Sequence, residues 1–276
     1  MSIIGWMGKP KLSKGKSGFT YTRTRSFNNS AKNSESSKNS FLLEDHYLSM
    51  IRDEDLRVLK KDKKFINRCA YLLQSLEGKT IKTTALHVDI VNSTEKVRTL
   101  SSEAAGMYYQ AFIESASDLI EDYGGYVLKN VGDCVLGFFP CSNYYIENHD
   151  KAVLCGLAIS DMIKDSLSPY FAERNLPSIA CRISADYGAA KVLRVGSNGD
   201  YSAVDLFGGA LNSASKISHY AKPNQMVIGD NLFWELIHSK DFEFKSIRNL
   251  DLMGKQIYPV YVVERCKCKI GGDNDE

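Results

Sequence analysis

The sequence lacks any run of about 18 apolar residues, the length that a membrane-spanning helix requires. It also lacks an apolar stretch of signal-peptide length near its first residues. No internal repeat is visible. An apolar share of 43% and a charged share of 25% are typical of globular proteins and exclude a fibrous or wholly disordered chain. We therefore expect a cytoplasmic globular protein with neither a membrane segment nor a secretory signal.

Cysteine pairs at metal-binding spacing are also scarce. The chain has seven cysteines, an odd number, and most lie within apolar runs. Cys266 and Cys268 stand close together near the C-terminus, but no second Cys/His pair at zinc-site spacing accompanies them. These features predict reduced thiols, as in a cytosolic protein, and two free thiols on a C-terminal tail.

The small net charge of +2 hides an uneven distribution. Residues 1–40 hold eight basic side chains against Glu35 alone, a net charge of +7. The remaining 236 residues hold 27 basic and 32 acidic side chains, a net charge of −5. A basic tail therefore precedes a mildly acidic body.

Composition and periodicity divide the chain into four parts. Residues 1–40 are rich in Ser, Lys, Asn and Gly without apolar periodicity, which predicts a disordered tail. In residues 41–79 apolar side chains recur at spacings near three and four, which predicts one or two amphipathic helices. We assign residues 80–265 to the main domain and residues 266–276 to a C-terminal tail.

The main domain alternates strands and helices in an order typical of α+β proteins. We expect strands over 83–91, 126–129, 134–139, 179–187, 189–195, 225–228, 242–247 and 257–264, and helices over 101–123, 151–166, 211–220 and 230–237. The strands over 179–187 and 189–195 are predicted to form a pair broken at Gly188. This order predicts a mainly antiparallel sheet with helices packed on one face.

Two aspartates interrupt apolar strands. Asp89 lies within the strand over 83–91, and Asp133 opens the strand over 134–139. A carboxylate beside a buried strand is costly unless it is paired or bound to a metal. A strand end and a hairpin turn can bring both to one sheet edge, where paired carboxylates suit Mg²⁺ or Mn²⁺. The alternative is two strand-end aspartates that face solvent.

Five segments then resemble, in order, the motifs of the class III nucleotidyl (adenylate and guanylate) cyclases. They are Asp89-Ile-Val-Asn-Ser-Thr94, Lys129-Asn-Val-Gly-Asp133, Arg182-Ile-Ser-Ala-Asp-Tyr-Gly188, Asp205-Leu-Phe-Gly-Gly-Ala-Leu-Asn212-Ser-Ala-Ser-Lys216, and Lys255 before the last strand. The resemblance covers about residues 80–265. It implies a ferredoxin-like, palm-type fold that works as a head-to-tail homodimer.

The resemblance also implies a two-metal site. Asp89 and Asp133 would hold two divalent cations, Mg²⁺ or Mn²⁺, with the carbonyl of Ile90 as a further ligand. The ribose 3′-hydroxyl would then attack the α-phosphorus of ATP in line, releasing pyrophosphate and forming 3′,5′-cyclic AMP.

The substrate-binding residues follow from the same motifs. Lys129 and Asp205 match the positions that read the base, and a lysine donor with an aspartate acceptor suits N1 and the 6-amino group of adenine. Asn212 would orient the ribose, and Lys255 would bind phosphate. Lys216 replaces the usual arginine and loses its planar set of donors. Because one lost transition-state donor typically costs about 3–4 kcal/mol, Arg182 and Arg194 are considered as further cations.

Three alternatives remain open. The enzyme could cyclise GTP or a pyrimidine nucleotide, or the domain could be a non-catalytic nucleotide-binding or dimerisation module, which the lysine at position 216 favours. Residues 41–79 would set the geometry of the dimer or cover its edge. The basic tail, with aromatic residues interleaved, could bind an anionic membrane surface or a nucleic acid, or could be a solvated linker.

Overall fold

The computed structural model describes residues 11–15, 18–22, 64–141, 147–196, 202–251 and 257–266. The chain divides into two compact units, Met1–Arg57 and Val58–Glu276. Among the helices in the described segments, none is long and apolar enough to cross a membrane. Predictions for residues 41–63, for Lys255 and for Cys268 fall outside the described residues.

The first unit contains a small antiparallel hairpin of β1 (Lys11–Gly15) and β2 (Gly18–Thr22). Lys11 pairs with Thr22, and Gly15 pairs with Gly18. The sequence analysis predicts a disordered tail over residues 1–40. The β1–β2 hairpin departs from that prediction. Gly15 ends β1 and Gly18 begins β2, and the composition of residues 1–40 does not reveal this pairing.

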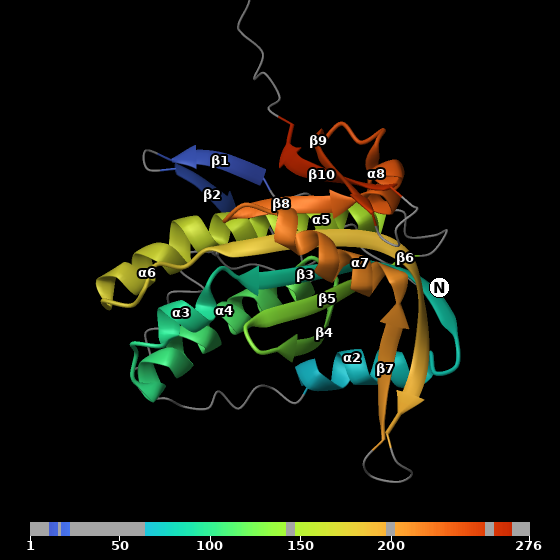
Figure 1. Cartoon of the computed structure of the whole chain (residues 1–276), viewed down its shortest axis with the longest axis horizontal. Coiled ribbons are helices and arrows are strands. Elements are labelled where there is room, and N and C mark those ends of the chain that lie inside the picture. Colours follow the sequence, from blue (N-terminus) through green and yellow to red (C-terminus); the bar gives the residue numbers. More distant parts are fainter. Residues whose placement is uncertain are drawn as a thin grey trace, which may run out of the picture. The chain divides into compact units, whose positions relative to one another are not determined.

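The second unit is built on one eight-stranded sheet (Figure 1). Its strands are β3 (Thr80–Ile90), β4 (Tyr126–Val131), β5 (Cys134–Cys141), β6 (Cys181–Val195), β7 (Ala203–Gly208), β8 (Gln225–Gly229), β9 (Phe242–Asp251) and β10 (Ile257–Arg265). Their order is β4-β5-β3-β6-β8-β10-β9, with β7 also paired to β6. Only the β6–β8 pair among these is parallel. The expected mixed, mainly antiparallel α+β fold is confirmed.

The helices connect these strands. They are α2 (Lys64–Ser75), α3 (Ser93–Val97), α4 (Ser102–Asp122), α5 (Glu147–Met162), α6 (Ser168–Glu173), α7 (Gly209–Ile217) and α8 (Asp230–Leu236), with a π-helical turn at Ile163–Leu167 and a 3-10 turn at Ser218–Tyr220. Helix α4 begins where the Ser101 hydroxyl accepts a hydrogen bond from the Ala104 N–H at 3.2 Å, which satisfies one of the otherwise unpaired N–H groups of the first turn.

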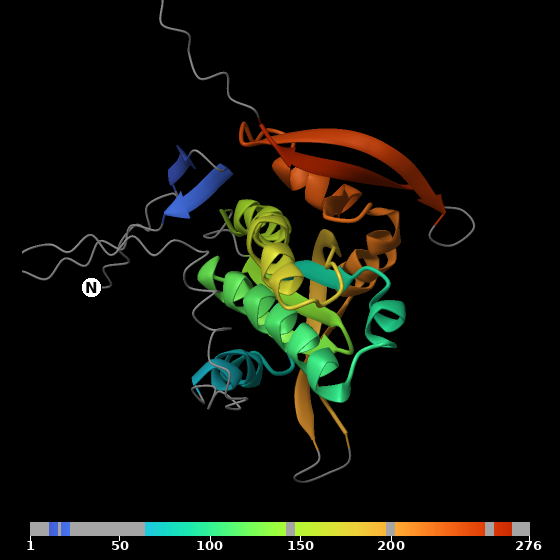
Figure 2. The same ribbon diagram turned by 90° about the vertical axis from the view of Figure 1, so that its left-hand side faces the viewer.

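The helices pack on both faces of the sheet. A Cβ on Gly156 of α5 would lie 3.0 Å from Ile183, whereas the neighbouring Ser184 donates to the Ala214 carbonyl of α7 at 2.8 Å. Since successive strand residues point to opposite faces, α5 and α7 lie on opposite sides of β6 (Figure 2). The long helices α4 and α5 pack together, whereas α7 lies on the other face, so the helices are not confined to one face as the sequence analysis expects.

The middle of the sheet differs from the expectation at Gly188. The predicted break is wrong, because β6 runs unbroken for 15 residues through this glycine. A Cβ at Gly188 would lie 3.6 Å from that of Ala210, so α7 passes close over the strand. The second half of β6 pairs with β7, a strand that the sequence analysis does not predict, and the two together extend beyond the rest of the sheet (Figures 1 and 2).

Candidate active site

Asp89 and Asp133 lie beside each other at one end of the central sheet. Asp89 is the penultimate residue of β3, and its register partner on β5 is Cys134, the neighbour of Asp133. Asp133 follows Gly132, whose φ of 62° suits the two-residue turn between β4 and β5. The structure therefore brings together the two carboxylates that the sequence singles out.

The surroundings of Asp89 make its negative charge costly. Partial burial raises the pKa of Asp89, and the negative charge of Asp133 raises it further, while Arg182 and His219 oppose both effects. A divalent cation held by both carboxylates would relieve this repulsion. Within the described segments, no group of three or more His, Cys, Asp or Glu side chains is arranged as a metal site. The residues fit a cation bound by two carboxylates, with main-chain carbonyl and phosphate oxygens completing its ligands.

The backbone after Asp89 also serves this site. Ile90, whose carbonyl is the proposed further ligand, is a buried residue that ends β3. Asn92 adopts the left-handed conformation, with φ of 54° and ψ of 38°, just before α3. Glycine and asparagine are the residues that adopt this conformation most readily. Asn92 therefore suits the turn that precedes α3.

Arg182 is the cation nearest to this pair on the sheet. Its register partner on β3 is Asp89, so both side chains point to the same face, and its charge lowers the pKa of Asp89. Its Nε is buried without a hydrogen-bond partner. Arg194, the other candidate cation, instead pairs with Glu77 after α2, with Nε–Oε1 and NH2–Oε2 distances of 2.9 and 2.6 Å. Of the two, only Arg182 lies at the carboxylates.

Lys129 and Asp205 meet although 76 residues separate them. Lys129 lies on β4 and Asp205 on β7, and their side chains form an ion pair with 41% and 22% exposure. Helix α2 packs against both strands and contributes Cys69. Burial, and then the negative charge of Asp205, raise the pKa of the Cys69 thiol to about 12. The structure thus assembles a donor and an acceptor at an accessible position.

Asn212 and Lys216 share the exposed face of α7. The opposite face of this helix carries the buried residues Ala210, Leu211, Ala214 and Ile217. Positions four residues apart lie on the same side of a helix, so both polar side chains point away from the sheet. Lys255, the remaining predicted site residue, lies outside the described residues.

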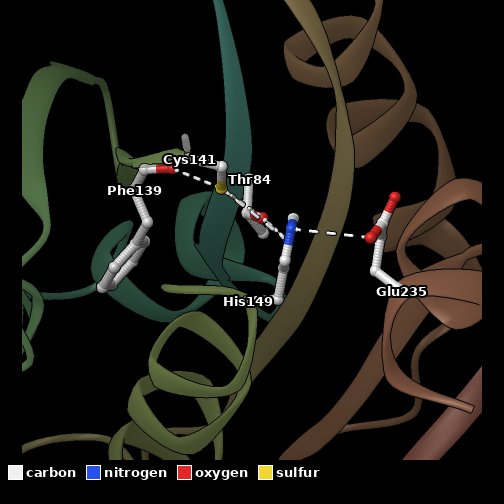
Figure 3. Close-up of polar contacts among 5 residues, drawn as sticks. All are labelled: Thr84, Phe139, Cys141, His149 and Glu235. Carbon is white, nitrogen blue, oxygen red and sulfur yellow. Dashed lines mark hydrogen bonds and ion pairs between the residues drawn. The ribbon is translucent and has the colours of Figure 1, made fainter. Parts of the chain in front are cut away.

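A second polar cluster lies on the other face of the sheet, around His149 of α5 (Figure 3). Its Nδ1 lies 2.8 Å from the Thr84 hydroxyl and 3.8 Å from the Cys141 sulfur, and its Nε2 lies 3.9 Å from Glu235. Burial raises the pKa of the Cys141 thiol. A protonated thiol is a poor nucleophile, so this Cys–His pair is a structural contact. The sequence analysis does not identify this cluster.

The described residues thus form a mixed sheet with two adjacent carboxylates at a strand end and a hairpin turn, and with a lysine–aspartate ion pair between β4 and β7. Residues 77–265 match the family described as the adenylate and guanylate cyclase catalytic domain. The chain therefore belongs to this family, as the resemblance predicts.

Known proteins agree with this assignment. A uridylate cyclase from Burkholderia cepacia is 29% identical over 158 residues, which make up 56% of this chain and 67% of that protein. A cytidylate cyclase from Escherichia coli is 25% identical over 163 residues, or 55% of this chain and 34% of that protein. The solved structure of an adenylyl cyclase from P. aeruginosa has a TM-score of 0.63 at 20% identity, covering 70% of this chain and 98% of that one.

Proposed function

We propose that this chain converts a pyrimidine nucleoside triphosphate to its 3′,5′-cyclic monophosphate and pyrophosphate. The observation that carries the cyclase chemistry is the adjacent placement of Asp89 and Asp133 in a domain of this family. The choice of a pyrimidine is supported by relatives that are named uridylate and cytidylate cyclases.

The role given to each site residue is the one implied by the family motif that it matches. Asp89, Asp133 and the Ile90 carbonyl would hold two divalent cations, Mg²⁺ or Mn²⁺, whose charge would favour deprotonation of the ribose 3′-hydroxyl and would offset the charge of the triphosphate. Asn212 orients the ribose, and Lys216 and Lys255 offer positive charge to the phosphates. The bond between the 3′-oxygen and the α-phosphorus forms as the bond to pyrophosphate breaks, so the protein acts chiefly by positioning.

The Lys129–Asp205 pair bears on the choice of base. A lysine donor and an aspartate acceptor complement a ring nitrogen and an adjacent amino group. Adenine offers these as N1 and the 6-amino group, and cytosine offers them as N3 and the 4-amino group. Uracil and guanine present an N–H and a carbonyl instead. A mismatched base would leave buried polar groups unpaired, so we propose CTP as the preferred pyrimidine.

ATP is the second candidate, because the same pair complements adenine equally well. Direct assay of the four nucleotides distinguishes the two candidates.

We further propose that the active form is a homodimer whose sites combine residues of both copies. Leu193, Val195 and Phe207 are 39%, 40% and 43% exposed on the β6–β7 pair. Leu193 is the register partner of Asp205, and Phe207 lies two residues from Asp205, so these apolar side chains share the face of the base-reading residue. A second copy that covers this face would complete a site there.

The experiment is a nucleotide screen. Purified protein is incubated with ATP, CTP, GTP or UTP and Mn²⁺, and cyclic nucleotide and pyrophosphate are measured by chromatography and mass spectrometry. We expect equal amounts of both products, with CTP the fastest substrate, and loss of turnover in Asp89→Ala and Asp133→Ala. Preference for ATP would support the second candidate, whereas preference for UTP would overturn the role given to the Lys129–Asp205 pair. Absence of cyclic product from all four would overturn the proposed function.

A further inference from the structure

Asp186 is a fully buried carboxylate that the proposed chemistry does not use. It lies on β6 with 0% exposure. The Ser213 and Tyr258 hydroxyls both donate to its Oδ2, at 2.5 and 2.6 Å, and the Tyr187 N–H donates to its Oδ1 at 2.9 Å. Burial raises the pKa of Asp186, and these hydrogen bonds oppose that effect. A buried carboxylate persists only where donors satisfy it in this way.

The carboxylate is also tightly enclosed. A Cβ on Gly229, at the end of β8, would lie 2.5 Å from the Asp186 Oδ1 atom. Only a residue without a side chain fits there. With β8 close on one side, the Oδ2 atom of Asp186 is bonded to side chains of α7 and β10.

The hydrogen bonds that this carboxylate accepts, together with those made by its partners, join four elements, β6, α7, β10 and α8. Ser213 lies on α7 and Tyr258 on β10. The Asn231 N–H of α8 donates to the Tyr258 hydroxyl at 3.1 Å, and its Nδ2 donates to the Tyr187 carbonyl at 3.2 Å. Asp186 is therefore the centre of a polar network that fastens α7 and α8 to the sheet.

Helix α7 buries an apolar face made of Ala210, Leu211, Ala214 and Ile217, and polar contacts add to this packing. Where Ala210 lies over Gly188, no larger side chain interlocks the helix with the strand. The polar anchors are the Ser213 hydroxyl on Asp186 and the Ser184 hydroxyl on the Ala214 carbonyl. The Ser213 hydroxyl oxygen also lies 2.8 Å from the Gly209 carbonyl oxygen. A charged carboxylate is a stronger acceptor than a carbonyl, so the bond to Asp186 dominates.

Ser213 directly follows Asn212 and precedes Lys216 by three residues. Each residue of an α-helix turns the direction of the side chain by about 100°, so a rotation of α7 that releases Ser213 redirects both neighbours. We propose that Asp186, acting through Ser213, is a positioning residue that fixes the rotation of α7 and hence the direction of Asn212 and Lys216. This inference rests on the proposed cyclase function for its catalytic consequence.

The first test is kinetic. In Ser213→Ala we expect kcat to fall about tenfold or more with little change in KM, since a misplacement of about 1 Å can cost on the order of 10²-fold. Ser213→Thr keeps the hydroxyl and should retain most of kcat. The matched control is Ser160→Ala, which removes a buried hydroxyl that donates to the Asn224 carbonyl at 2.8 Å on another element. We expect it to leave kcat within about twofold of the original chain.

The second test does not depend on turnover. Amide hydrogen exchange of residues 209–217 should accelerate in Ser213→Ala and Asp186→Asn, but not in Ser160→Ala. Unchanged exchange in α7 would overturn the anchoring, and accelerated exchange with unchanged kcat would overturn the positioning role. If the original chain forms no cyclic nucleotide, the proposed function fails, and the exchange measurement still decides whether Asp186 anchors the helix.

Discussion

The substitution Asp205→Asn separates a role in base recognition from a role in folding. It keeps the size of the side chain but removes the charge that pairs with Lys129. Because the paired side chains are 41% and 22% exposed, solvent screens the pair, and we expect it to contribute less than about 1 kcal/mol to stability. For a domain of this size, that free energy shifts Tm by roughly 2–4 °C at most.

The effect on substrate choice should be larger than the effect on folding. An asparagine presents an N–H as well as a carbonyl oxygen, so it can accept from an amino group or donate to a carbonyl group. Since a specific base contact contributes roughly 1–3 kcal/mol of discrimination, the ratio of kcat/KM for CTP to that for UTP should fall about tenfold.

The assay compares kcat/KM for CTP, UTP and ATP between the two proteins, with thermal unfolding measured in parallel. Glu77→Gln is the matched control, because it weakens another exposed ion pair, that with Arg194, away from the carboxylates. A large loss of Tm with an unchanged nucleotide ratio would refute the role in base recognition, and so would an equal change in the control.

Three further predictions concern stability. Phe138→Ala should destabilise the domain by about 3–5 kcal/mol, measured by denaturant unfolding, because this 0% exposed ring stacks on Tyr126 at a centroid distance of 5.5 Å; a loss below about 1 kcal/mol would contradict the packing. Asn92→Ala should cost about 1 kcal/mol in the same assay, and Asn92→Gly should cost less, since φ is 54° at this position. Burial lowers the pKa of His149 below the ordinary value of 6.5, while Glu235 opposes this, so the unfolded chain binds a proton that the folded chain does not. Stability should therefore fall as the pH decreases below about 6.5, and His149→Gln should weaken that fall; an unchanged pH profile in this variant would contradict the assignment.

Local signals in the sequence predict much of the fold. The apolar strand over 83–91 corresponds to β3, and the capping serine before α4 marks the start of that helix. The Gly132-Asp133 turn predicts the β4–β5 hairpin, because a two-residue connection requires a residue with positive φ. Each of these features depends on residues that are neighbours in sequence.

The sequence predictions are wrong where contacts between residues far apart in the sequence determine the structure. Gly188 resembles a strand break, yet its role is to admit Ala210 of α7. Strand β7 is short and carries Asp205 in its middle, so it has no apolar periodicity of its own and depends on pairing with β6. Tertiary pairing overrides the local preference in both places.

The candidate site shows the same division. The carboxylates Asp89 and Asp133 attract attention because charge within an apolar strand is unusual, and the structure places them together. The ion pair of Lys129 with Asp205 spans 76 residues, so only the resemblance to a family connects them in advance. Asp186 has partners 27 and 72 residues away, and no local pattern identifies them.

Mixing two impaired variants tests the central claim most directly. Asp89→Ala keeps the base-reading pair and alone should form no cyclic nucleotide, whereas Asp205→Ala keeps the carboxylates and alone should form much less cyclic nucleotide than the original chain. In an equal mixture, half of the dimers combine both variants, and each of these has one intact site. The account predicts recovery of about 25% of the activity of the original chain in the mixture, because one of four sites is then complete. Lack of recovery in a mixture that demonstrably exchanges subunits would contradict a cyclase site shared between two copies.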